Sequence, residues 1–146
     1  MSIDYPKQLK ESFRLVKNGS NYEVNPLDSL TPRLQKPLKA GQIEAFLVGF
    51  KQIAAEAFET GNPKQDSVLR TIPFSVITVK ATSGATQQVK LYPIPYSVIE
   101  TDQQGRAVNK TYVERYFALV NETEFMLVQH RVFQSILWGY DFFFEE

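Results

Sequence analysis

Cysteine is absent from this chain of 146 residues, and histidine and tryptophan each occur only once. Without cysteine the chain has no disulfides, no thiolate metal sites and no cysteine nucleophile, and its redox compartment stays undetermined. No apolar run of about eighteen residues is present, and the N-terminus lacks a signal-peptide core. The sequence therefore predicts no membrane-spanning helix.

An excess of charge of one sign is also missing. Sixteen Lys and Arg residues balance sixteen Asp and Glu residues, so the formal net charge is zero. Residues 1–73 carry ten basic and eight acidic side chains, and residues 74–146 carry six and eight. Neither half provides the long-range attraction that drives binding to nucleic acid or to anionic membranes. We therefore expect no nucleic-acid partner.

The residues that usually perform catalysis are scarce. His130 is the only histidine and would be the natural general acid or base, but its predicted strand-to-helix junction is typical of a capping or partly exposed histidine. The sequence has no second histidine for a metal triad, no G-x-S-x-G elbow and no phosphate-binding glycine loop. It predicts no catalytic residue, no cofactor and no metal site. A hydrolase-like enzyme that uses His130 and a nearby acid stays as an alternative.

Alternating apolar residues separated by turn residues predict three hairpins. They comprise Phe13–Val24 with a turn at Asn18–Asn21, Phe74–Ile94 with a turn at Ser83–Gly84, and Tyr116–Val128 with a turn at Asn121–Glu124. After the second hairpin, Pro93 and Pro95 either end regular pairing or place the strand at an edge of the sheet. Residues 101–110 are polar and are expected to form an exposed loop.

Two helices complete the predicted fold. Apolar residues from Ile43 to Phe58 follow i, i+3, i+4, i+7 spacing, which predicts one long amphipathic helix over about residues 41–59, ended by Gly61 and Pro63. A short helix is expected over about residues 131–138. The sequence predicts a single α+β domain over residues 1–146, with an antiparallel sheet built from hairpins and the helices packed mainly on one face.

Aromatic residues concentrate at the C-terminus, where residues 112–146 hold ten of the nineteen. Aromatic side chains bury much area for little chain length, so this segment is expected to anchor the fold. The last five large aromatics allow two interpretations, namely a terminal strand docked onto the core or an exposed interaction surface for a partner or a membrane. These residues are Trp138, Tyr140, Phe142, Phe143 and Phe144.

Two parts of the chain resemble a bacterial family. The stretches Ile3-Asp4-Tyr5-Pro6, Ser12-Phe13-Arg14-Leu15-Val16-Lys17-Asn18-Gly19 and Tyr22-Glu23-Val24-Asn25, followed by an amphipathic helix, resemble its recurring unit. The stretches Arg115-Tyr116-Phe117-Ala118-Leu119-Val120-Asn121, Phe125 to Gln129 and Val132-Phe133 resemble its C-terminal strands. The family is domain-of-unknown-function 4340, found in Bacteroidetes-type bacteria.

The resemblance implies an envelope role. Members of that family typically carry an N-terminal membrane anchor and a larger extracytoplasmic portion, and some accompany gliding-motility or ABC-transport components. By this resemblance the chain is the soluble C-terminal part of a longer anchored protein, and the family supplies no catalytic residues. We therefore expect a non-catalytic, envelope-associated domain that contacts another protein, such as an ABC-transport component. A small-ligand or glycan-binding module, with Trp138 stacking on sugars, is the alternative from another class.

Overall fold

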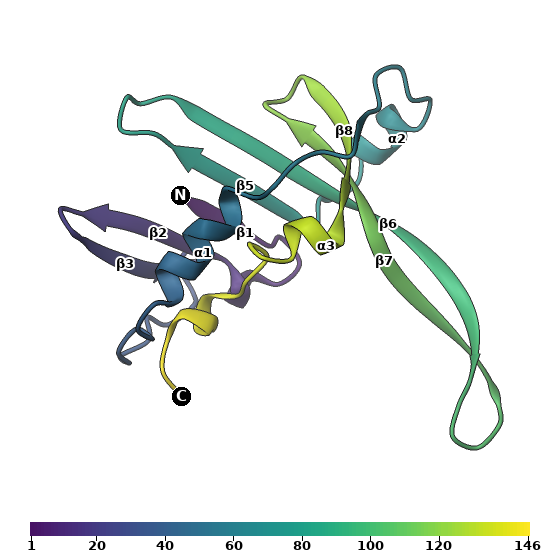
Figure 1. Cartoon of the computed structure of the whole chain (residues 1–146), viewed down its shortest axis with the longest axis horizontal. Helices are drawn as coiled ribbons and strands as arrows, with labels where there is room; N and C mark the ends of the chain where they lie inside the picture. Colours follow the sequence, from purple (N-terminus) through teal and green to yellow (C-terminus); the bar gives the residue numbers. More distant parts are fainter.

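A computed structural model describes all 146 residues. The chain folds into one eight-stranded antiparallel sheet with the order β3-β2-β1-β5-β6-β7-β8-β4 (Figure 1). The strands are β1 (Ser2–Asp4), β2 (Phe13–Asn18), β3 (Asn21–Pro26), β4 (Ala57–Phe58), β5 (Ser75–Lys80), β6 (Thr86–Thr101), β7 (Ala107–Val120) and β8 (Glu124–Gln129). The helical segments are η1 (Leu9–Glu11), α1 (Gln42–Phe50), α2 (Gln65–Leu69), α3 (His130–Phe133) and η2 (Tyr140–Phe143). None of these helical segments has the length and hydropathy of a membrane span.

The three predicted hairpins are confirmed. Strand β2 pairs with β3, β5 with β6, and β7 with β8, each in antiparallel register. Their turns contain Gly19 at φ 64°, Gly84 at φ 89° and Asn121 at φ 51°. Glycine and asparagine reach positive φ at the lowest cost, so the turn residues fix where each strand reverses. The molecule is therefore an α+β fold with a sheet built from hairpins.

Strand β1 joins the first hairpin to the rest of the sheet. It lies between β2 and β5, and Ile3 is opposite Phe13 on one side and Ile77 on the other. These three apolar side chains are buried. Residues 2–4 therefore fill the middle of the sheet, although the sequence predicts no strand there.

The main core lies between one face of the sheet and the segments α1, α3 and η2 (Figure 1). At its centre the Phe143 ring is 4.9 Å from Phe13 and 5.2 Å from Phe46, both in edge-to-face geometry. This arrangement suits the aromatic quadrupole and adds to the free energy gained from apolar burial. The other buried members of the core are Ile3, Tyr5, Leu15, Val24, Ile43, Ile77, Leu91, Tyr116, Ala118, Val128, Phe133, Ile136, Tyr140 and Phe144.

The predicted long helix over residues 41–59 is wrong, because α1 ends at Phe50. Beyond it, the Glu56 N–H donates to the Leu127 carbonyl at 2.8 Å, and the Glu59 N–H donates to the Phe125 carbonyl at 2.9 Å. The chain thus forms the short edge strand β4 beside β8. An open sheet edge satisfies these backbone groups as well as a helix would, and local periodicity carries no information about such a long-range partner.

The predicted helix over residues 131–138 is also shorter than expected. Strand β8 leads directly into α3 at His130, as the sequence predicts, but α3 ends at Phe133. The Ile136 N–H donates to the Phe133 carbonyl in a tight turn, and the Trp138 carbonyl accepts a hydrogen bond from the Tyr5 hydroxyl. Contacts with the core therefore replace the helical hydrogen bonds.

Strand β6 does not end at its prolines. The Leu91 carbonyl accepts a hydrogen bond from the Phe74 N–H, so the backbone groups of Leu91 face β5. Every second residue of β6 after Leu91, including Pro93 and Pro95, therefore directs its backbone groups to that same edge. Strand β5 pairs no further than Leu91, and the prolines therefore lie at an open edge, which is one of their two predicted outcomes. The expected exposed loop over 101–110 is too long, because β6 extends to Thr101 and β7 begins at Ala107, which leaves only residues 102–106 as the turn. Residues 95–113 form a two-stranded ribbon that projects from the sheet, which we call the β6–β7 arm (Figure 1).

Candidate functional site

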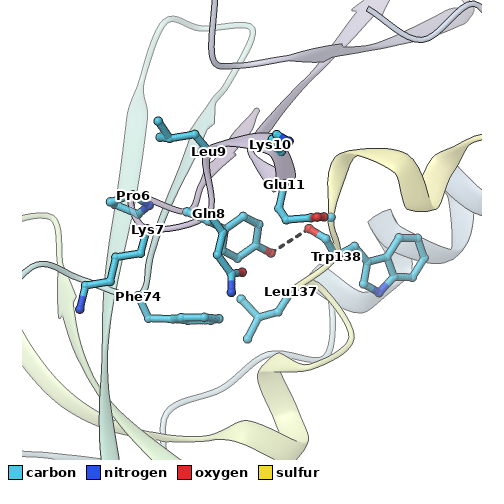
Figure 2. Close-up of a pocket in the computed structure, with 11 residues that line it drawn as sticks. Pro6, Lys7, Gln8, Leu9, Lys10, Glu11, Phe74, Leu137 and Trp138 are labelled. Atoms are coloured by element: carbon cyan, nitrogen blue, oxygen red, sulfur yellow. Dashed lines mark hydrogen bonds between the residues drawn. The ribbon is translucent and has the colours of Figure 1, made fainter. Parts of the chain in front are cut away.

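A cleft of about 760 Å³ opens beside η1 (Figure 2). It is lined by Tyr5, Pro6, Lys7, Gln8, Leu9, Lys10, Glu11, Phe74, Leu137, Trp138 and Gly139. Figure 2 shows the Gln8 and Leu137 side chains directed into the cleft and the Lys7 side chain directed away from it. The interior is therefore partly apolar, and the basic groups lie at its rim.

Tyr5 forms the buried wall of this cleft. Its N–H donates to Ser12 Oγ at 2.8 Å, and its hydroxyl donates to the Trp138 carbonyl at 2.8 Å (Figure 2). The ring packs edge-to-face on Phe74 at 5.6 Å. Burial raises the pKa of Tyr5 well above its usual value, and the nearby Glu11 charge raises this pKa further. The hydroxyl therefore stays protonated at neutral pH and acts as a structural donor, not as a base.

Glu11 and Gly139 fit closely against each other at the inner end of the cleft. A Cβ atom on Gly139 would meet Glu11 Oε2, so a larger residue at this position would require the Glu11 carboxylate to move. The Glu11 carboxylate has no ion-pair partner. No group of three or more His, Cys, Asp or Glu side chains is arranged to hold a metal ion. The cleft thus presents apolar surface from Phe74 and Leu137 and polar groups from Gln8 and Glu11.

His130 lies at a second, smaller cavity of about 340 Å³. Its Nδ1 atom is 3.0 Å from the hydroxyl of the buried Tyr116, whose pKa is raised by burial. Glu114 lines the same cavity, but its carboxylate accepts a hydrogen bond from the Tyr96 hydroxyl at 2.8 Å. His130 is therefore held by a phenol, and the structure does not bring it together with the carboxylate that an activated general base requires.

An ion pair lies beside this cavity. Arg115 Nε donates to Glu56 Oε2 at 3.0 Å, and Arg115 Nη2 donates to Glu56 Oε1 at 3.4 Å. These hydrogen bonds hold the pKa of Glu56 below its usual value. The pair connects the segment before β4 to β7, and an exposed pair of this kind contributes little to stability.

Three of the five terminal aromatics are inaccessible to a partner. Tyr140, Phe143 and Phe144 are buried, whereas Phe142 is 47% exposed. Trp138 is half-buried and packs against the core. The interaction surface suggested by the sequence is thereby reduced to Phe142 and part of Trp138.

Backbone contacts explain why the terminal segment docks. The Lys39 N–H donates to the Phe143 carbonyl at 2.8 Å, and the Glu145 N–H donates to the Pro37 carbonyl at 2.9 Å. The Tyr140 hydroxyl accepts the Leu34 N–H at 2.9 Å. The connector between β3 and α1 therefore holds the tail in place as a 3₁₀ turn and an extended end.

The β6–β7 arm is the surface that the sequence analysis missed. On one face, Tyr96 lies opposite Tyr112 with the ring centroids 5.8 Å apart, and the Tyr112 hydroxyl donates to Glu100 at 2.7 Å. The other face carries Ile99 and a contact of 3.3 Å between the Ser97 and Thr111 hydroxyls. The β-branched and aromatic residues from Tyr96 to Ile99 and from Thr111 to Val113, on either side of a turn with Gly105, are the signal that could have revealed it.

Comparison of the chain with protein-family models, with curated proteins and with solved structures finds no match. The resemblance to the domain-of-unknown-function 4340 family therefore stays a prediction.

Proposed function

We propose that this chain is a non-catalytic protein-interaction domain and that the β6–β7 arm is its contact element. The observation that carries this proposal is the exposure of apolar side chains on the arm. Ile99 is 75% exposed, and Tyr96, Val98 and Tyr112 are between 38% and 40% exposed. The arm projects away from the core that could bury them (Figure 1). Apolar groups gathered on a protruding element are typical of a surface that meets a partner.

Ion pairs and hydrogen bonds within the arm also hold it in one conformation before it meets a partner. Glu100 pairs with Lys110 at 3.1 Å, and Asp102 pairs with Arg106 at 3.1 Å. The Asp102 side chain also accepts the N–H groups of Gln104 and Arg106, which orders the turn at the tip. A ribbon ordered before binding loses less conformational entropy on association.

The geometry around His130 supports the non-catalytic part of the proposal. Its ring contacts Tyr116, and no carboxylate, serine or threonine hydroxyl bonds to it. The cleft beside η1 contains a protonated tyrosine and one carboxylate but no nucleophile paired with a base. Nucleophilic catalysis by a hydroxyl group depends on a base within hydrogen-bond reach that activates it.

The resemblance to the domain-of-unknown-function 4340 family supports an envelope setting for this interaction. On that basis we propose that the domain is the extracytoplasmic part of an anchored protein. Its partner would be another envelope protein, with an ABC-transport or gliding-motility component as the leading class.

Site-specific photo-crosslinking in cells tests the arm as the contact element. A photoreactive residue replaces Val98 or Ile99 in the arm, and the matched control replaces Leu30, which is 87% exposed on the connector. We expect the arm positions to crosslink to one defined protein and the control position not to. Crosslinks of equal yield from Leu30, or none from the arm, would overturn the proposal.

The cleft beside η1 favours a second candidate function, the binding of a small ligand or a glycan. Trp138 is the only tryptophan; its carbonyl bonds to Tyr5 in the cleft wall while its ring packs on Phe143, so a ligand that displaces this segment changes its fluorescence. Soluble cell-wall glycan fragments should change the emission of the native protein in a saturable way. A Gln8→Ala variant should weaken that response, while Gln104→Ala at the arm tip serves as the control. An unchanged emission spectrum at all ligand concentrations would remove this candidate.

A further inference from the structure

The two long edges of the β6–β7 arm differ in their backbone groups. The Asp102 N–H donates to the Arg106 carbonyl, so the even-numbered residues of β6 and of the outer part of β7 face each other. The odd-numbered residues therefore direct their N–H and C=O groups outward. On β7 these residues are 107, 109, 111 and 113, and on β6 they are 93, 95, 97, 99 and 101.

Neither outer edge of the arm has a partner strand. Strand β8 pairs with β7 only from Arg115 to Val120, and β5 pairs with β6 only as far as Leu91. The edge of β6 is protected, because Pro93 and Pro95 have no N–H to offer at the base of the arm. The edge of β7 from Ala107 to Val113 contains no proline, so all four outward residues present both a donor and an acceptor.

The composition of the arm favours a second copy of the chain as the occupant of this edge. Residues 95–113 contain two acidic and two basic side chains, and these form the two internal ion pairs already described. Lys110 is the only charged residue between 107 and 113, and its own Glu100 neutralises it. Each arm therefore has zero net charge, and where residues 107–113 of two copies pair, the two Lys110 side chains lie opposite each other, each bound to its own Glu100. A strongly charged partner would find no complementary charge.

We propose that the outer edge of β7, residues 107–113, pairs with the same edge of a second copy and forms a continuous four-stranded ribbon across a twofold axis. Antiparallel pairing of two identical strands is compatible with this symmetry, and every strand pair in the sheet is already antiparallel. A two-stranded ribbon alone is only marginally stable in water, so a third and a fourth strand stabilise the arm. This inference rests on the proposed function, because it uses the same arm; it assigns the outer edge of β7 to a second copy and leaves the two faces of the arm open to another protein.

A pair of proline variants tests the choice of edge. Ser97 and Thr111 lie opposite each other, and both direct their N–H outward, on opposite edges of the arm. Thr111→Pro and Ser97→Pro remove the same hydroxyl contact and keep the hydrogen bonds between β6 and β7. We expect Thr111→Pro to weaken self-association of the purified protein by about tenfold or more, because outward N–H donors are lost in both copies. Sedimentation velocity over a concentration series measures the effect.

Ser97→Pro is the matched control and should associate like the native protein. An equal loss for the two variants would overturn the choice of the β7 edge. A native protein that stays monomeric over the whole concentration series would overturn self-pairing altogether. Circular dichroism of both variants establishes that the sheet is retained.

Single cysteines provide an independent test, because the native chain has none. Each position from 107 to 113 receives a cysteine in turn, and disulfide-linked dimers are quantified after mild oxidation. In an antiparallel pair of identical strands, only the residue on the twofold axis lies opposite the same residue of the second copy. The yield of disulfide-linked dimers should therefore peak at the axis and fall toward both ends of the segment. A flat profile, or none above that of Ser97→Cys, would contradict the proposal.

The outcomes separate this inference from the proposed function. A monomeric protein whose arm still crosslinks in cells to a different protein would leave the function in place and remove only the second copy as partner. An arm that crosslinks to nothing in cells would remove the function, whatever the purified protein does.

Discussion

Removing the Phe143 ring is expected to destabilise the fold far more than removing its neighbour Phe142. Phe143 is fully buried, with its ring 4.9 Å from Phe13, 5.2 Å from Phe46 and 5.4 Å from Trp138. Phe143→Ala removes roughly 150 Å² of buried apolar area. At about 25 cal/mol per Å², this corresponds to a loss of about 4 kcal/mol in the free energy of unfolding. Measured Phe→Ala substitutions in cores cost about 3–5 kcal/mol, because a cavity is left as well. The free energy of unfolding of a typical domain is only about 5–15 kcal/mol, so the loss expected for Phe143→Ala is a large part of it.

Phe142 provides the matched control. It is 47% exposed, and its main contacts are Trp138 at 4.7 Å and the Lys39 ammonium at 5.5 Å. Phe142→Ala should therefore cost only about 1 kcal/mol. Urea unfolding followed by circular dichroism gives both values, provided that the slope with urea is unchanged. Equal losses for the two variants, or a larger loss for Phe142→Ala, would refute the docked geometry of the tail.

Three further predictions concern the core. Gly49→Ala should destabilise the fold by about 1 kcal/mol despite the better helix propensity of alanine, since its Cβ would lie 2.9 Å from the Ser135 carbonyl oxygen; thermal unfolding that shows a gain would contradict this packing. His130→Ala should cost about 1–3 kcal/mol, because the buried Tyr116 hydroxyl loses its partner; in a double-mutant cycle, Tyr116→Phe should recover part of that loss, and strict additivity would argue against the contact. Because the pKa of Tyr5 is raised, the folded state keeps a proton that the unfolded state releases above about pH 10. The contribution of Tyr5 to the free energy of unfolding is therefore complete below about pH 10 and falls above it. The fall is up to about 1.4 kcal/mol per pH unit for each such group. Tyr5→Phe should flatten this alkaline decline in urea midpoints measured across pH, and an unchanged slope would exclude Tyr5 as a cause.

The hairpins could be predicted because their information is local. Turn residues such as Gly19, Gly84 and Asn121 determine where the chain reverses, and alternation determines which side chains are buried. The end of α1 could not be predicted in this way. The periodicity from Ile53 to Phe58 is compatible with a helix. Ala57 and Phe58 form a strand because they pair with the free edge of β8, which lies seventy residues away in the sequence.

The surface that we propose as the contact element was predicted less well than the fold, for a physical reason. Residues 101–110 are polar and contain Gly105, which is typical of a loop, and Pro93 suggested that pairing had ended. A hairpin outside the core needs no continuous apolar face, so its strands carry little of the signal that burial imposes on other strands. The terminal aromatics left two interpretations open, because a high density of aromatic residues is compatible with a buried anchor as well as with an exposed surface.

Amide hydrogen exchange along β7 tests the central claim most directly. In the monomer, the N–H groups of Asn109 and Thr111 face solvent while those of Lys110 and Tyr112 face β6, so fast and slow exchange should alternate along the strand. Raising the protein concentration should protect Asn109 and Thr111, and Ser97 on the opposite edge should stay unprotected. Exchange at Asn109 and Thr111 that is independent of concentration, or protection that develops at Ser97 instead, would contradict the account.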